Sequence, residues 1–151
     1  MNPEIKTILL AMTPFNELRG TIPLAIGFYH LSPWSAYLLA IIGNILPIFF
    51  LLWFWSKVAI ICQSWTKAQK FFRWLFERTR KRFYKKYSLY GDLALIIFVA
   101  IPLPFTGAWT GSIAAFLFGI PYWRALGLIF FGILIAGLII TGLSAGFFAF
   151  I

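Results

Sequence analysis

The sequence predicts an all-α integral membrane protein, built as an inverted repeat in which a re-entrant helical hairpin is followed by a transmembrane helix. Three observations predict this class. The 151 residues are 62% hydrophobic and only 11% charged, whereas soluble domains carry about 25% charged residues. Uncharged stretches such as 38–55 and 125–151 are long enough to cross a bilayer. Prolines recur at matching places in the two halves of the chain.

A chain of this length is enough for one domain, and we expect residues 1–151 to form a single membrane domain. Its predicted parts are repeat 1 at 3–62, a basic interfacial helix at 63–88 and repeat 2 at 89–151. A removable signal peptide is not expected, because Glu17 and Arg19 stand where a small-residue cleavage site should follow the first apolar run. We therefore expect a multi-pass protein of the cell membrane.

The first repeat is interrupted at its centre by the stretch TPFNELRGT, residues 13–21. Proline removes a backbone donor and disfavours helix at the residue before it. Backbone groups freed in this way cannot face lipid and must be buried in protein or line a wet cavity. We predict a hairpin that dips into the membrane, turns at this stretch and returns. A spanning helix from Pro33 to about Ser56 follows, with proline in its favoured place at a helix start.

The segment between the repeats carries most of the positive charge. Ten of the thirteen basic residues lie between Lys57 and Lys86. Because the cluster joins two membrane segments, the positive-inside rule explains it better than nucleic-acid binding and places it in the cytoplasm. Apolar residues recur at three- and four-residue steps, which predicts an amphipathic helix lying on anionic lipid head groups. They are Trp65, Ala68, Phe72, Leu75, Phe76, Thr79, Phe83 and Tyr87. A topology anchor is the simpler role, and lipid sensing is the alternative.

The second repeat resembles the first. A shift of 88 residues superposes Pro14 on Pro102 and Pro33 on Pro121 without a gap. The second centre is IPLPFTGAWTGS, residues 101–112, and the second spanning helix is predicted from Pro121 to about Phe148. Only one spanning helix and the interfacial helix separate the two hairpins. They should therefore enter from opposite faces, as in the inverted repeats of secondary transporters.

A rival topology treats each hairpin as one kinked spanning helix, which gives four crossings and two cytoplasmic termini. Lys6 favours this alternative, because it would then lie inside. Arg124 favours the hairpins, because they place it inside and the four-span topology places it outside. The absence of Lys or Arg after Arg124 also suits an external C-terminus, so the sequence favours two hairpins and two spanning helices.

Two motifs, ELRGTIPLAIG at 17–27 and PLPFTGAWTGS at 102–112, resemble the small multi-drug export protein family, and the resemblance covers nearly the whole chain. That family is similar to the DedA membrane proteins. This similarity implies paired re-entrant hairpins, movement of lipids such as undecaprenyl phosphate, and coupling to the proton gradient. The chain departs from the DedA pattern because its acidic and basic pair lies in the first hairpin and the second tip is neutral. A proton relay through a second acidic residue is therefore in doubt.

Ionisable groups inside membrane segments are costly and usually mark function, which singles out Glu17 and Arg19. Thr21 is expected to cap the return helix of the first hairpin, and Thr106 or Thr110 the matching helix of the second. Two helix N-termini and Arg19 would then form an anion site near the midplane. The predicted substrate-binding residues are Asn16, Glu17, Arg19, Thr21, Thr106, Trp109 and Thr110.

Four of these residues have simpler explanations. Glu17 and Arg19 can form a charge pair that only stabilises the turn, with Asn16 as the N-cap. Otherwise Glu17 exchanges a proton. Burial raises the pKa of a carboxyl and a nearby Arg lowers it, and the sequence leaves open which effect prevails. Trp109 can fill space beside glycines, or form a flat wall for an apolar or cationic substrate.

These features leave three functions open. The first is a transporter or lipid flippase for an amphipathic, anionic, lipid-phosphate-like substrate. The second is multidrug efflux of cations by proton exchange at Glu17, and the third is a membrane scaffold without cargo. We expect no enzyme, cofactor or metal, since no catalytic set appears and Cys62 and His30 each stand alone. The Gly142 and Gly146 step favours close helix packing or a homo-oligomer.

Overall fold

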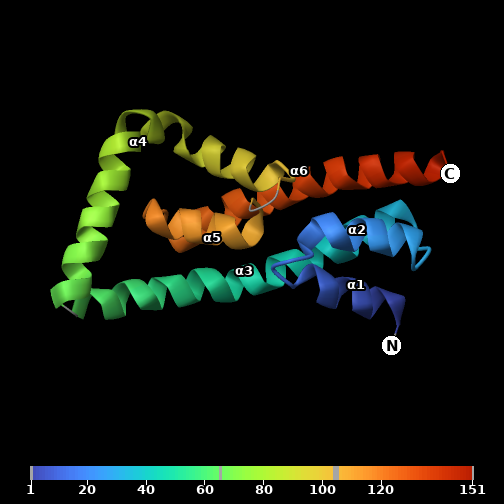
Figure 1. Cartoon of the computed structure of the whole chain (residues 1–151), viewed down its shortest axis with the longest axis horizontal. Coiled ribbons are helices and arrows are strands. Elements are labelled where there is room, and N and C mark those ends of the chain that lie inside the picture. Colours follow the sequence, from blue (N-terminus) through green and yellow to red (C-terminus); the bar gives the residue numbers. More distant parts are fainter. Residues whose placement is uncertain (1, 65, 104–105, 151) are drawn as a thin grey trace.

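The computed structural model describes residues 2–64, 66–103 and 106–150, and every element in these ranges is an α-helix (Figure 1). The side chains at 62, 63, 68, 72, 75, 76 and 79–89 are not part of that description. The helices are α1 (Pro3–Ala11), α2 (Glu17–Gly27), α3 (Pro33–Ser64), α4 (Thr66–Ala100), α5 (Ala108–Leu117) and α6 (Tyr122–Ala149).

Two helices are long and apolar enough to cross a membrane, Pro33–Ile61 within α3 and Tyr122–Ala149, which is α6. Both predicted spanning helices are therefore confirmed as helices of spanning length, and Pro121 occupies the N-cap position of α6. The predicted end of the first, near Ser56, is wrong. α3 continues to Ser64, because Lys57 is a good helix former and does not end the helix.

The helix is interrupted at both predicted centres. Residues 12–16 separate α1 from α2, and the 101–107 segment separates α4 from α5. In each case the helices on the two sides of the interruption contact each other: α1 packs on α2, and α4 packs on α5. Neither centre forms part of one continuous helix: α1 ends at Ala11, before Pro14, and α4 ends at Ala100, before Pro102.

The basic segment does not form a separate helix. α4 runs without interruption from Thr66 to Ala100, so the predicted boundary at residue 88 falls inside it. Figure 1 shows α4 changing direction along its length, so that its last part, Tyr90–Ala100, runs beside α5 and α6. Every residue of the predicted apolar face, from Trp65 to Tyr87, lies outside the described residues or has a side chain outside that description.

The centre of the fold is the pair α3 and α6, which run in opposite directions (Figure 1). α1 and α2 both pack on α3, and α4 and α5 both pack on α6. The two halves also pack on each other: α2 of the first half packs on α6 of the second, and α5 of the second half packs on α3 of the first. The loops of the two halves are thereby brought together between the long helices.

Small residues allow the helices to approach closely. A Cβ at Gly43 of α3 would collide with the carbonyl oxygen of Ile8 and lie 2.7 Å from Cβ of Ala11. A Cβ at Gly132 of α6 would lie 2.6 Å from Cβ of Val99 in α4. Glycine is required at both places because close helix contact leaves no space for a side chain.

We predict opposite effects of alanine at two helical glycines. Gly43→Ala should lower thermal stability in detergent, because α1 must move away from α3 to admit the methyl group. Gly142→Ala is the control, since no atom lies within 4 Å of its added Cβ and alanine is about 1 kcal/mol more favourable than glycine in a helix. Equal melting temperatures for the two variants would contradict the close contact between α1 and α3.

Candidate functional site

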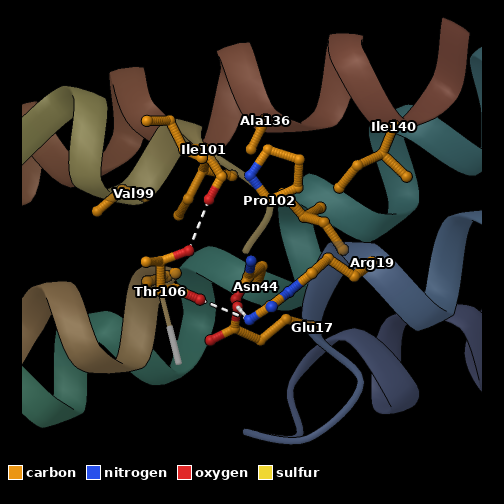
Figure 2. A pocket seen from close by; sticks show the side chains of 13 residues that line it. Glu17, Arg19, Asn44, Val99, Ile101, Pro102, Thr106, Ala136 and Ile140 are labelled. Carbon is orange, nitrogen blue, oxygen red and sulfur yellow. Dashed lines mark hydrogen bonds and ion pairs between the residues drawn. The ribbon is translucent and has the colours of Figure 1, made fainter. Parts of the chain in front are cut away.

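The site lies where the loop after α1 meets the loop after α4. Glu17 and Arg19, at the start of α2, reach residues 103–109 of the other half of the chain. Figure 2 shows Glu17, Arg19 and Thr106 facing one another across a small space, with Asn44 of α3 beside Glu17. Four segments therefore supply one site: the start of α2, the middle of α3, the 101–107 segment and the start of α5.

Arg19 binds the carbonyl groups that the interruption after α4 leaves without helical partners. One terminal nitrogen of its guanidinium donates to the Leu103 carbonyl, and the other donates to the Thr106 carbonyl at 2.5 Å. The planar guanidinium suits this task because its donors point outward as a fork. Its positive charge also lies near the carbonyl end of α4, where the helix dipole is negative.

Glu17 binds the opposite helix end. Its Oε1 accepts a hydrogen bond from the backbone N–H of Trp109 at 3.3 Å, in the first turn of α5. The positive end of a helix dipole favours a carboxylate at this position. Oε2 lies 3.8 Å from Nη2 of Arg19, and the Glu17 side chain is only 7% exposed. The buried carboxylate is thus held by a helix N-terminus and by a cation.

The backbone around this contact is strained or depends on glycine. Glu17 has a φ of +40°, which is uncommon for a residue with a side chain and costs about 1–3 kcal/mol. Gly107 has a φ of +140°, and a Cβ there would collide with the Glu17 carboxylate, lying 2.8 Å from its Cδ. The start of α2 and the segment before α5 are therefore in close contact at Gly107, a position where only glycine fits.

The space between these groups is small. Its volume is about 10 Å³, which is room for roughly one water molecule. Its walls come from α2, α3, α4, α5, α6 and the 101–107 segment. The lining residues are Glu17, Leu18, Arg19, Asn44, Val99, Ile101, Pro102, Thr106, Gly107, Ala108, Ile133, Ala136 and Ile140. A drug or a lipid head group is larger than a space of this volume.

Asn44 was missed by the sequence analysis. It is 1% exposed, lines the space described above and lies in the middle of α3. The sequence did mark this residue, because Asn44 is the only amide, hydroxyl or charged side chain between Leu38 and Trp55. A polar group in such a stretch is costly to bury without hydrogen bonds, which should have marked it as a candidate.

The predicted capping roles of the threonines are wrong, whereas the predicted N-cap position of Asn16 is confirmed. Thr21 lies inside α2, and its buried hydroxyl has no hydrogen-bond partner among the described residues. Asn16 occupies the N-cap position of α2 without a capping hydrogen bond from its side chain, and Gly107 occupies that of α5. No threonine caps α5 because a tertiary contact replaces the local one: the Glu17 carboxylate, from the other half of the chain, binds the start of α5.

Thr106 and Thr110 stabilise the interrupted segment instead. The Thr106 hydroxyl bonds to the Ile101 carbonyl at 2.6 Å and accepts the N–H of Leu103 at 3.1 Å. The Thr110 hydroxyl donates to the Gly107 carbonyl at 3.3 Å. Of the predicted site residues, Glu17, Arg19, Thr106 and the backbone of Trp109 come together, whereas the Thr21 hydroxyl makes no bond to them.

Other charged groups lie outside this site. Arg124 of α6 donates from Nε to the Asp92 carboxylate of α4 at 3.0 Å, and both side chains are more than one-third exposed. An exposed pair of this kind contributes about 0–1 kcal/mol. His30 is exposed after the end of α2, and within the described residues no three His, Cys, Asp or Glu side chains form a group that could hold a metal ion.

Two apolar helices have spanning length, and the buried Glu17 carboxylate lies beside Arg19 where interrupted helices meet, features that are typical of a helical membrane protein. Residues 17–139 match the model of the family described as "Putative small multi-drug export protein". The chain belongs to this family, and the matched region starts at Glu17 and includes Arg19 and the loop after α4. No curated protein and no solved structure was found to match the chain.

The contacts of Arg19 predict a graded loss of stability. Arg19→Ala removes the guanidinium from the Leu103 and Thr106 carbonyls and from the buried Glu17 carboxylate, and should cost about 2–4 kcal/mol, because these three groups lose a charged partner. Arg19→Lys keeps the charge but not the fork and should lie between wild type and Arg19→Ala. Denaturant unfolding in detergent measures both variants. An Arg19→Ala variant as stable as wild type would show that Arg19 does not hold the two loops together.

Proposed function

We propose that the chain is a secondary transporter that moves an amphipathic substrate between the two loops that meet at Glu17 and Arg19. The observation that carries this proposal is the placement of a buried acid and a base at the contact between two interrupted helices. Ionisable groups inside membrane segments mark substrate and proton pathways. Transporter sites typically form where interrupted helices meet near the midplane of the bilayer.

The proposed architecture is an inverted repeat, in which α1–α2 and the end of α4 with α5 are re-entrant hairpins. The reciprocal packing supports it, because α2 contacts α6 while α5 contacts α3. The opposite directions of α3 and α6 support it as well (Figure 1). In such transporters one repeat moves against the other around a central site.

In this proposal the Glu17–Arg19 contacts close the pathway. The space is large enough for about one water molecule, so the loops must separate before a substrate can enter. Separation breaks the bonds of Arg19 to the Leu103 and Thr106 carbonyls and the bond of Glu17 to Trp109. Substrate binding must replace these bonds, because a buried charge without partners is costly.

An anionic head group is the substrate that this geometry favours. The Glu17 carboxylate already binds the two groups that a phosphate would seek, namely Arg19 and the N–H at the start of α5. An anion can take that place if Glu17 first loses its negative charge. Binding of a proton by Glu17 would therefore release the site to the anion, which couples the two movements.

Efflux of cationic drugs is the second candidate, and the family description together with the buried carboxylate favours it. A cation would compete with Arg19 for Glu17, and a proton would displace the cation. Arg19 would then be dispensable, whereas for an anion it is a direct partner. The two candidates thus make opposite predictions for the same pair of variants.

Transport assays on proteoliposomes separate these candidates. For a lipid phosphate, Arg19→Ala should reduce flux more than Glu17→Gln, and Glu17→Gln should remove the dependence on pH. For a cationic drug, Glu17→Gln should abolish flux and Arg19→Ala should preserve it. The assay follows a fluorescent lipid phosphate and a fluorescent cationic dye in separate vesicles. If wild-type protein moves neither probe faster than protein-free vesicles, the chain acts as a scaffold and the proposal fails.

The basic part of α4 is proposed to lie on the cytoplasmic face against anionic lipids. The described basic side chains Lys67, Lys70, Arg73 and Arg78 are exposed, as are the rings of Phe71 and Trp74. Arg78 lies over the Trp74 ring at 5.0 Å, so rings and charges share the surface of this segment. Gly142 and Gly146 of α6 have open space at their Cβ positions, which would admit a second copy of the chain.

The proposed topology predicts the location of the C-terminus. With two hairpins and two spanning helices, a reporter fused after residue 151 should be external, and a reporter inserted near Lys70 should be cytoplasmic. Paired reporters that are active on opposite faces of the membrane measure this. Two cytoplasmic signals would instead support four full crossings and would contradict the re-entrant hairpins.

A further inference from the structure

Asn44 is a buried polar group that the closed site leaves unused. Its side chain is 1% exposed, and no described residue donates a hydrogen bond to its Oδ1. It lies in the middle of α3 and lines the same space as Glu17 and Arg19 (Figure 2). A buried acceptor without a partner costs about 1–3 kcal/mol, so a group bound in that space would explain why an amide is placed there.

The size and chemistry of the space restrict what that group can be. A volume of about 10 Å³ admits about one water molecule and excludes a larger ligand. A buried water needs two to four polar partners, and here the amide of Asn44, the carboxylate of Glu17 and the guanidinium of Arg19 are available. A metal cation is disfavoured, because Arg19 lies 3.8 Å from Glu17, which supplies the only carboxylate among the described residues that line the space.

We propose that Asn44 and Glu17 bind one water molecule between them, and that Glu17 exchanges its proton through this water. The water donates one hydrogen bond to Oδ1 of Asn44 and one to the Glu17 carboxylate. A proton arrives as hydronium, the water passes it to the carboxylate, and Glu17 becomes neutral while a neutral water remains. Arg19 is 30% exposed and lines the same space, so the space extends toward the surface from which protons come.

This water site deepens the proposed function because it supplies the proton that would release Glu17, and to that extent it rests on that function. The binding of water itself does not require transport. It requires only that the amide and the carboxylate share a wet space. Water binding can therefore be tested on a protein that moves no substrate.

Water-edited solid-state NMR on the full chain in lipid tests the site directly. The chain has only four acidic residues, so Glu17→Gln assigns the Glu17 carboxyl signal by its disappearance. We expect magnetisation to pass from water to this carboxyl and to the Asn44 side-chain amide. Absence of transfer to either group in the wild-type protein overturns the proposal.

Substitution of Asn44 tests its role in holding the water. Asn44→Leu fills similar volume without polar atoms, so the transfer from water to Glu17 should be lost and the melting temperature should fall. If Asn44→Leu does not fold, Asn44→Val serves the same purpose. Ser144→Ala is the control, because Ser144 is a buried polar residue of α6 that does not line the space. Its Glu17 signal should match that of wild type.

Two results would overturn the role of Asn44. One is an Asn44→Leu variant with undiminished water transfer to Glu17. The other is an Asn44→Leu variant that is more stable than wild type, as expected when an apolar group replaces an amide that binds nothing. Loss of the water signal on addition of sodium would identify a cation as the occupant and would overturn the proposal as well. Failure of transport with the water signal intact would refute only the transport function.

Discussion

Arg19 and Glu17 bind the two ends of the interruption between α4 and α5, and the arrangement of the two halves depends on these contacts. An interrupted helix leaves carbonyl groups at one end and N–H groups at the other. In lipid these groups must find partners within the protein. Arg19 supplies donors to the carbonyls of Leu103 and Thr106, while Glu17 supplies an acceptor to the N–H of Trp109. Each charge also matches the sign of the nearby helix dipole.

This arrangement explains why a chain with few charges places two of them in a hydrophobic segment. The first half provides the charges, and the second half provides the uncharged backbone that binds them. The charges thus join the halves while partly neutralising each other at 3.8 Å. The same contacts leave space for about one water molecule, beside a buried amide at Asn44. A site closed by hydrogen bonds to charged groups can open when one of the charges is removed, which is the basis of the proposed coupling to protons.

Sequence reasoning succeeded where a feature depends on neighbouring residues. Proline predicted both helix interruptions, and uncharged length predicted α3 and α6. It failed where the partner is distant in the chain. Thr21 was predicted to cap a helix because Thr is a favoured N-cap residue, yet α2 begins at Glu17. Asn44 was overlooked because its importance depends on the loops that pack against the middle of α3.

The sequence by itself determined that this protein suits a lipid bilayer rather than water. It also determined the two long helices, the two helix interruptions and the positions of the few ionisable groups. These properties follow from local composition, since apolar length and proline act on the residues beside them. Only the tertiary structure decided that Glu17 binds the start of α5, that Arg19 binds the 101–107 segment and that Gly107 must remain glycine. Those contacts join residues more than eighty positions apart, and no periodicity or spacing within either half specifies which groups will meet.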